Sequence, residues 1–134
     1  MQILFDVIGH PAPQGSKNQF GAESSQFVKP WRVDVRHAAI DAMPADWPTD
    51  CAVAVNITFK FIQPKSHFTS KGKPSSNWTK YPIGRNKGDI DKLCRSTLDA
   101  LTGVLFDDDK QVVYLIAKRL WGRTAGASIS ICHL

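Results

Sequence analysis

The ten residues from Ala52 to Phe61 constrain the fold of this chain more than any other segment. Apolar side chains alternate there with small or polar ones, at Val53, Val55, Ile57, Phe59 and Phe61. Because successive side chains of a strand point to opposite faces of a sheet, this period of two predicts a β-strand with one continuously apolar face. Such a face must be buried, so other elements have to pack against this strand.

A second strong pattern predicts a helix that begins beside Asp89. Apolar or small side chains recur there at helical spacing, at Ile90, Leu93, Cys94, Thr97, Leu98 and Leu101. This spacing places them on one face of an α-helix. Asp89 stands where an acid can cap free N–H groups, and Thr102-Gly103 breaks the helix.

Weaker patterns complete the expected set of elements. Strands are expected at 3–8, 111–120 and 127–132, and a helix at 31–43 that Pro44 ends. Apolar residues on both sides of the segment 111–120 favour a central position in a sheet. The sequence therefore predicts one α+β domain over residues 1–134, with about four strands and two main helices.

The composition excludes several classes of protein. The 134 residues include 17 Lys and Arg against 12 Asp and Glu, a formal net charge of +5, and 43% of them are hydrophobic, which excludes wholesale disorder. No apolar run approaches the roughly 18 residues that span a bilayer, and the first residues have no basic start before their short apolar run, so we expect no secretory signal. Three cysteines without CxxC spacing argue against a disulfide framework and a zinc knuckle. We expect a cytoplasmic protein with no membrane partner and no nucleotide cofactor.

Positive and negative charges are segregated along the chain. The loop 63–88 has no acidic residue, and its basic and aromatic residues are Lys65, Lys71, Lys73, Lys80, Arg85, Lys87, Phe68, Trp78 and Tyr81. Six of the twelve acids follow between Asp89 and Asp109. Such an arrangement suits a phosphate-rich ligand with a divalent cation beside it, although a solvated loop next to a helix cap is the alternative. We expect this long basic loop to be functional and to be mobile without a ligand.

Two of the acids form an Asp-x-Asp pair at the expected helix start. Residues i and i+2 of a helix point about 200° apart, so Asp89 and Asp91 converge only if Asp89 precedes the first helical turn. Gly88 makes such a non-helical approach easy. The alternative is that both acids serve only to cap the helix.

The remaining acids differ in what they can reach. Asp99 lies roughly 12 Å along the helix axis from Asp91, so these two cannot share a metal ion, and Asp99 is better placed to pair with Arg95. The triplet Asp107-Asp108-Asp109 stands just before the strand expected at 111–120. A hard cation such as Mg²⁺ would relieve the repulsion among three acids, and the alternative is a solvated acidic turn.

Three motifs, taken in order and spacing, resemble those of one known family. They are Gly88-Asp89-Ile90-Asp91-Lys92-Leu93, Leu98-Asp99-Ala100-Leu101-Thr102-Gly103 and Asp107-Asp108-Asp109-Lys110-Gln111-Val112-Val113. Together they resemble the RusA family of bacterial and phage Holliday-junction resolvases, also called crossover junction endodeoxyribonucleases. The segment 11–17 resembles the N-terminal Pro/Gly loop of that family, and 57–67 resembles its second strand and the start of its basic loop.

The resemblance implies a compact homodimer that binds four-way DNA junctions by their structure. It implies paired, symmetric nicks made with Mg²⁺ or Mn²⁺, in a domain with a mixed sheet. Carried over by motif, the metal ligands are Asp89, Asp91 and Asp109, the last because it stands two residues before Gln111. Asp108 is the runner-up. The functional basic residue one turn beyond the second acid corresponds to Arg95.

This chain departs from the family pattern at two side chains and one turn. Lys92 follows the second acid where the family often has Asn, and Arg95 replaces the Lys of the best-known pattern. Arginine is a planar fork that keeps its proton, whereas lysine is a compact point charge, so Arg95 suits phosphate attraction. The turn between Leu101 and Asp109 is about one residue shorter than in that pattern.

This interpretation gives each candidate residue a role. Asp89, Asp91, Asp109 and Arg95 are catalytic. The expected DNA-binding residues are Lys65, Lys71, Lys73, Lys80, Arg85, Lys87, Lys92 and Trp78. A C₂ homodimer would match the two-fold symmetry of a junction. The alternatives are a metal-dependent nuclease for other branched DNA, a junction-binding protein that does not cut, and an unrelated binding domain.

Overall fold

A computed structural model describes residues 1–15, 26–84 and 88–134 of the chain. The strands and main helices are β1 (Gln2–Ile8), α1 (Val28–Ala42), β2 (Val53–Ile62), α2 (Ile90–Leu101), β3 (Val112–Gly122) and β4 (Gly126–His133). Two short 3-10 helices, η1 (Lys65–His67) and η3 (Asp109–Gln111), lie in the connections. The predicted α+β class with four strands and two main helices is confirmed.

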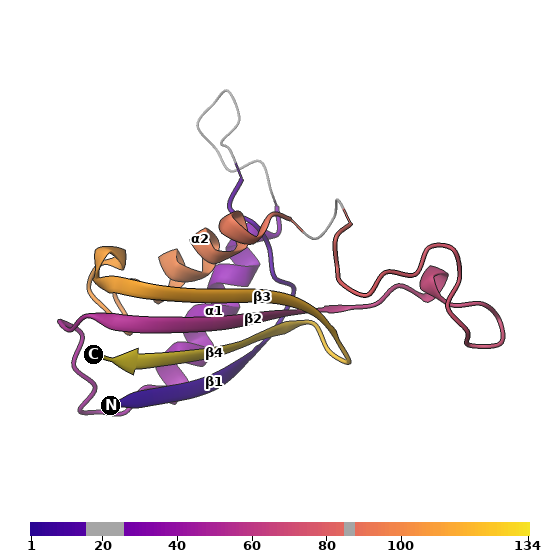
Figure 1. The fold of residues 1–134 in the computed structure, drawn as a ribbon. Coiled ribbons are helices and arrows are strands. Elements are labelled where there is room, and N and C mark those ends of the chain that lie inside the picture. The colour runs from indigo at the N-terminus through magenta and orange to yellow at the C-terminus, as the bar shows by residue number, and fades with distance from the viewer. Residues whose placement is uncertain (16–25, 85–87) are drawn as a thin grey trace, which may run out of the picture.

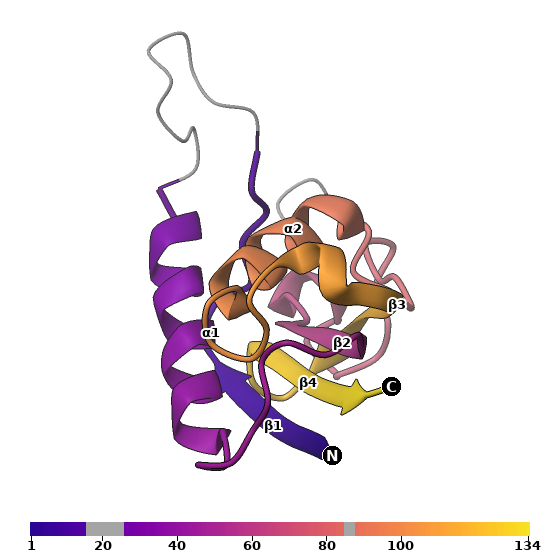
Figure 2. The ribbon, with the colours of Figure 1, turned by 90° about the vertical axis from the view of Figure 1, so that its left-hand side faces the viewer.

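The strands form one mixed sheet in the order β1-β4-β2-β3. Strand β4 is antiparallel to both of its neighbours, β1 and β2, whereas β2 and β3 run parallel. Both helices lie on the same face of the sheet (Figures 1 and 2). None of the described helices is long and apolar enough to cross a membrane.

The alternating pattern of β2 places its apolar face in the core. Val53, Val55, Ile57, Phe59 and Phe61 are all buried, as predicted. Strand β4 adds Ile129 and Ile131 beside them, and α2 covers them with Leu93 and Leu101. The two segments with the clearest sequence periods therefore form the centre of the hydrophobic core.

Helix α1 begins three residues before the expected start at residue 31. Pro30 is tolerated in the first turn because the N–H groups there have no partner within the helix. The buried residues are Val28, Trp31, Val35 and Ala39, whereas Val33 and Ile40 are exposed. The indole Nε1 of Trp31 donates to Thr97 Oγ1 of α2 at 3.1 Å and fixes the two helices together.

The expectation that residues 111–120 form a central strand was wrong. Strand β3 lies at one edge of the sheet, and its Val113, Tyr114, Leu115 and Ile116 are exposed. A two-sided apolar pattern predicts burial of both faces, but it does not say which molecule provides the cover. Within the described part of the chain, β2 is the only strand that pairs with β3.

Because β2 and β3 run parallel, the basic loop and the start of α2 lie at one end of β3 and the acidic triplet 107–109 lies at the other. The basic loop leaves β2 at Ile62, which pairs with Gly122, and Arg119 Nη1 of β3 donates to Gly88 O at 2.6 Å. At the opposite end of β3, Asp107 N donates to Thr49 O at 3.0 Å. The start of α2 and the acidic triplet are therefore separated by most of the length of β3 (Figure 1).

Candidate active site

The start of α2 has the geometry that the Asp-x-Asp pair requires. Asp89 is the N-cap residue, with extended backbone angles of φ −79° and ψ 145°, and Asp91 lies in the first turn. Gly88 precedes them with a φ of +76°, in the left-handed region that glycine tolerates best. A Cβ at Gly88 would also lie 2.6 Å from Pro13 Cγ. Gly88 therefore provides the predicted non-helical approach, and packing against Pro13 holds it.

Residues 12–14 form a strap across the first turns of α2. Gln14 N donates to Lys92 O at 3.0 Å, and Ser96 Oγ donates to Ala12 O at 2.6 Å. The side-chain Oε1 of Gln14 accepts a hydrogen bond from Arg32 Nη2 of α1. The strap thus links the first turns of α2 to α1 through hydrogen bonds that no sequence pattern indicated.

An open groove of about 630 Å³ runs between α2 and β3. Its lining residues are Gln14, Ile90, Asp91, Cys94, Arg95, Leu98, Asp99, Asp109, Leu115 and Ala117. Three of the four predicted catalytic residues, Asp91, Arg95 and Asp109, share this groove, and Asp89 lies beside Asp91 in the chain. The floor is apolar and the charged groups stand along it, which suits a ligand with a charged backbone.

The groove does not bring the three predicted metal ligands of one chain together. Among the residues described, no three His, Cys, Asp or Glu side chains gather closely enough to hold one ion. Asp109 lies beyond the C-terminal end of α2, whereas Asp89 and Asp91 lie at its start. Carboxylate oxygens suit Mg²⁺ in kind, but a single described chain does not assemble the predicted set.

The acidic turn before β3 distinguishes the two candidates for the third ligand. Asp108 caps η3, because its Oδ1 accepts from Lys110 N at 2.9 Å and its N–H donates to Gln111 Oε1 at 2.8 Å. The hydrogen bond from the Lys110 backbone is the main cause that lowers the pKa of Asp108 below its usual value. The Asp108 carboxylate thus accepts a hydrogen bond within its own turn, whereas its neighbour Asp109 lines the groove.

Arg95 faces the groove without the partner that the sequence suggested. Its side chain is exposed, and in the described part of the chain no ion pair joins it to Asp91 or Asp99. Asp91 instead forms an ion pair with Lys92, whose Nζ lies 4.0 Å from Asp91 Oδ2. Arg95 is therefore available to an anionic ligand.

Cys94 lies between these charged residues on the groove floor. Burial, and secondly the negative charge of Asp91, raise the pKa of its thiol. A thiol that stays protonated is a poor nucleophile and a poor metal ligand. The chemistry of the groove therefore rests on its carboxylates and its guanidinium group.

A family model described as Endodeoxyribonuclease RusA matches residues 7–132 of the 134-residue chain. The chain belongs to the RusA endodeoxyribonuclease family. No curated protein matches it. The family comprises nucleases that resolve Holliday junctions, so the chain is identified as a nuclease, and the strap, the groove and the basic loop all lie inside the matched residues.

The basic loop of this RusA-family protein is anchored to the sheet near both ends of its described part. Trp121 Nε1 of β3 donates to Thr79 O at 2.9 Å, and Gln63 Nε2 donates to the same oxygen at 3.1 Å. The His67 ring packs edge-on against Trp121, with their centroids 5.5 Å apart. These contacts direct the rest of the loop away from the body of the protein (Figure 1).

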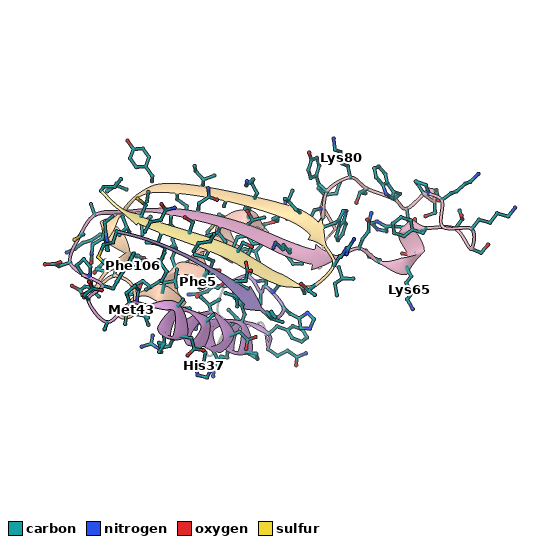
Figure 3. All side chains as sticks on the ribbon, turned by 90° about the horizontal axis from the view of Figure 1, so that it is seen from below. Phe5, His37, Met43, Lys65, Lys80 and Phe106 are labelled. Carbon is teal, nitrogen blue, oxygen red and sulfur yellow. The ribbon has the colours of Figure 1, made fainter. Side chains whose placement is uncertain are left out.

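The predicted DNA-binding residues of the described loop are exposed. They are Lys65, Lys71, Lys73, Lys80 and Trp78, and the exposed fraction of Trp78 is 41%. Figure 3 shows Lys65 and Lys80 on opposite sides of the loop, each pointing away from it. Arg85 and Lys87 lie outside the described residues, and Lys92 lies on α2 beside Asp91. The loop therefore presents cations and aromatic rings together to solvent.

Proposed function

We propose that this RusA-family protein is a homodimeric endodeoxyribonuclease that resolves four-way DNA junctions by paired, symmetric nicks. It would require Mg²⁺, with Mn²⁺ as a substitute, and act in recombination and repair in the cytoplasm of a bacterium or a phage-infected cell. The observation that carries this proposal is the groove between α2 and β3, which Asp91 and Arg95 line near the start of α2 and Asp109 lines beyond its C-terminal end. An exposed basic loop beside this groove gives the DNA an electrostatic path to it.

The chain's own residues have distinct parts in this reaction. Asp89 and Asp91 would hold Mg²⁺ at the start of α2, where a bound metal polarises the scissile phosphate and lowers the pKa of a water. Arg95, one turn further along, would bind the same phosphate and offset the charge that develops during cleavage. Lys92 would contribute further positive charge.

The third carboxylate would come from a second copy of the chain. Strand β3 has an unpaired edge, and an exposed edge with apolar side chains invites pairing with another strand. In antiparallel pairing centred near Leu115, position 109 of one chain falls opposite position 121 of the other. Arg119, two residues before position 121, donates a hydrogen bond to Gly88 O, just before the start of α2. The partner subunit's Asp109 would then lie at the start of α2, beside Asp89 and Asp91.

A dimer of this kind also explains why β3 is apolar on both sides. Pairing across a two-fold axis would bring the exposed Val113, Tyr114, Leu115 and Ile116 against side chains of the partner's β3 and cover part of their surface. It would form two equivalent catalytic centres, each from both chains. A four-way junction has the same two-fold symmetry, so each centre would meet one of two opposed strands.

The basic loop would bind the arms of the junction. Its lysines supply attraction to the DNA backbone that does not depend on sequence. Trp78 would stack on bases that unpair at the junction centre, a contact that every base can make through its π-face. The basic loop would therefore recognise the branched structure and not a particular sequence.

The test is cleavage of a four-way junction with each strand end-labelled in turn, beside a linear duplex, with and without Mg²⁺. We expect paired symmetric nicks in the junction alone, lost in chelator and in Asp91→Asn but kept in Asp41→Asn, which makes the same change on exposed α1. Equal cutting of flaps or forks would instead indicate a nuclease for branched DNA in general. Tight junction binding without cutting in either metal would indicate a binding protein.

A further inference from the structure

We infer that Gln14 is a DNA-phosphate contact of the groove, and that Arg32 fixes the orientation of its side-chain amide. The inference rests on the proposed function, because it assigns a new substrate-contacting residue to the same groove. Gln14 lies on the N-terminal strap, far in sequence from the acidic motifs, and half-buried against α2.

The first step is that the backbone of Gln14 has a defined position. Its N–H donates to Lys92 O at 3.0 Å, one residue beyond Asp91. Pro13 packs on Gly88, and Ala12 O accepts from Ser96 Oγ. The Cα of Gln14 is therefore positioned by the same turns of α2 that position Asp91 and Arg95.

The second step is that the direction of the side-chain amide follows from hydrogen-bonding chemistry. A guanidinium group donates hydrogen bonds and cannot accept them, so the glutamine atom that meets Arg32 Nη2 must be the oxygen Oε1. The amide nitrogen Nε2 is then the other end of the group. Gln14 lines the groove, and no acceptor among the described residues takes a hydrogen bond from Nε2.

The third step concerns the charges of the groove. Three acids and one cation line it: Asp91, Asp99, Asp109 and Arg95. Lys92 already lies 4.0 Å from Asp91. A further cation at position 14 would compete with a metal ion for the carboxylates, whereas a neutral amide donates to a phosphate oxygen without doing so. The hydrogen bond from Arg32 polarises the amide and makes Nε2 a stronger donor. Gln14 thus complements Arg95 as a second phosphate contact.

The test is Gln14→Glu, which keeps the side-chain length and an oxygen for Arg32 but removes both donors and adds a negative charge. We expect a Tm equal to or above that of the wild type, because Glu forms an ion pair with Arg32. We expect junction binding to weaken, and KM to rise, by about tenfold to a hundredfold. Gln2→Glu, which makes the same change at an exposed position of β1, is the matched control and should bind like the wild type.

A second variant, Gln14→Met, separates donor loss from charge repulsion. It removes the donors without adding charge, so it should also weaken junction binding, measured by fluorescence anisotropy without metal at a temperature well below its Tm. Binding and KM of both Gln14 variants equal to those of Gln2→Glu would overturn the inference. The proposed function fails separately, if the wild-type protein does not cut the junction.

Discussion

Adjacent carboxylates at the turn before β3 have different roles. Asp108 accepts a backbone hydrogen bond and caps η3, whereas Asp109 lines the groove. Counting residues back from Gln111 already favoured Asp109, but the sequence gives both acids the same chemistry. The distinction depends on which carboxylate the turn itself uses.

Asp109→Asn should abolish metal-dependent junction cleavage with little change in Tm. Asp108→Asn should keep cleavage, because an asparagine oxygen still caps the turn. The measurement is the single-turnover nicking rate at saturating enzyme, with Tm recorded for both proteins. Loss of cleavage in Asp108→Asn with normal cleavage in Asp109→Asn would contradict these roles.

The ionised cap of Asp108 also predicts a dependence of stability on pH. The folded protein lowers the pKa of Asp108 below its ordinary value of 3.8, so the folded state binds this proton less readily than the unfolded state. The resulting stabilisation is complete well above pH 3.8 and is lost as pH falls through the lower folded pKa. Thermal melts should show wild type more stable than Asp108→Asn at neutral pH, by a margin that shrinks in acid. A margin that grows in acid would be inconsistent with this cap.

At the scale of elements, the sequence predicted those whose pattern depends only on their own residues. The alternation in β2 and the stripe of α2 each specify one buried face. The apolar face of β2 is buried as expected. In α2, Leu93, Cys94, Thr97 and Leu101 are buried, whereas Ile90 is exposed and Leu98 is half-buried where they line the groove. The position of β3 was not predictable, because its two-sided pattern does not identify what covers it. The segment 11–17 was noted for its resemblance to the family's N-terminal loop, but its contact with α2 was not predicted. Residues 12–14 contact α2 mainly through their own backbone atoms, which leave no periodic pattern in the sequence.

Ile116→Lys should shift the protein from dimer to monomer. Ile116 is 57% exposed on β3, and in the proposed pairing of two β3 strands a charge there would replace its apolar contact with the partner strand. The measurement is molar mass by sedimentation equilibrium over a range of concentrations. Leu4→Lys is the control, since Leu4 is 72% exposed on β1 at the opposite edge of the sheet. A dimer that persists in Ile116→Lys and dissociates in Leu4→Lys would place the interface at the other edge.

At the scale of the whole molecule, the charged groups of the proposed function lie at opposite ends of the sheet. The basic loop and the start of α2 lie at one end, and the acidic triplet lies at the other (Figure 1). The sequence indicated a basic loop beside grouped acids, but it could not show that one chain keeps the third acid apart. Convergence of the carboxylates is a property of the proposed assembly, which single-chain patterns do not encode.

Lys71→Ala should weaken junction binding and reduce its dependence on salt. Removal of one phosphate-binding cation should lower the slope of log K against log[salt] by about 0.9. Arg36→Ala, an exposed cation on α1, should leave the slope unchanged. The measurement is junction affinity at several salt concentrations without divalent metal. Equal slopes for wild type and Lys71→Ala would show that the basic loop does not contact the backbone at this residue.

The composite catalytic centre is tested most directly by pairing two inactive chains. Asp91→Asn and Asp109→Asn subunits, coexpressed with different tags and purified through both, form a dimer in which one centre carries both substitutions and the other carries neither. We predict that each homodimer is inactive and that this mixed dimer nicks one strand of a junction, at about half the wild-type total. A mixed dimer as inactive as its parents would contradict the prediction, because each centre would then be drawn from a single chain.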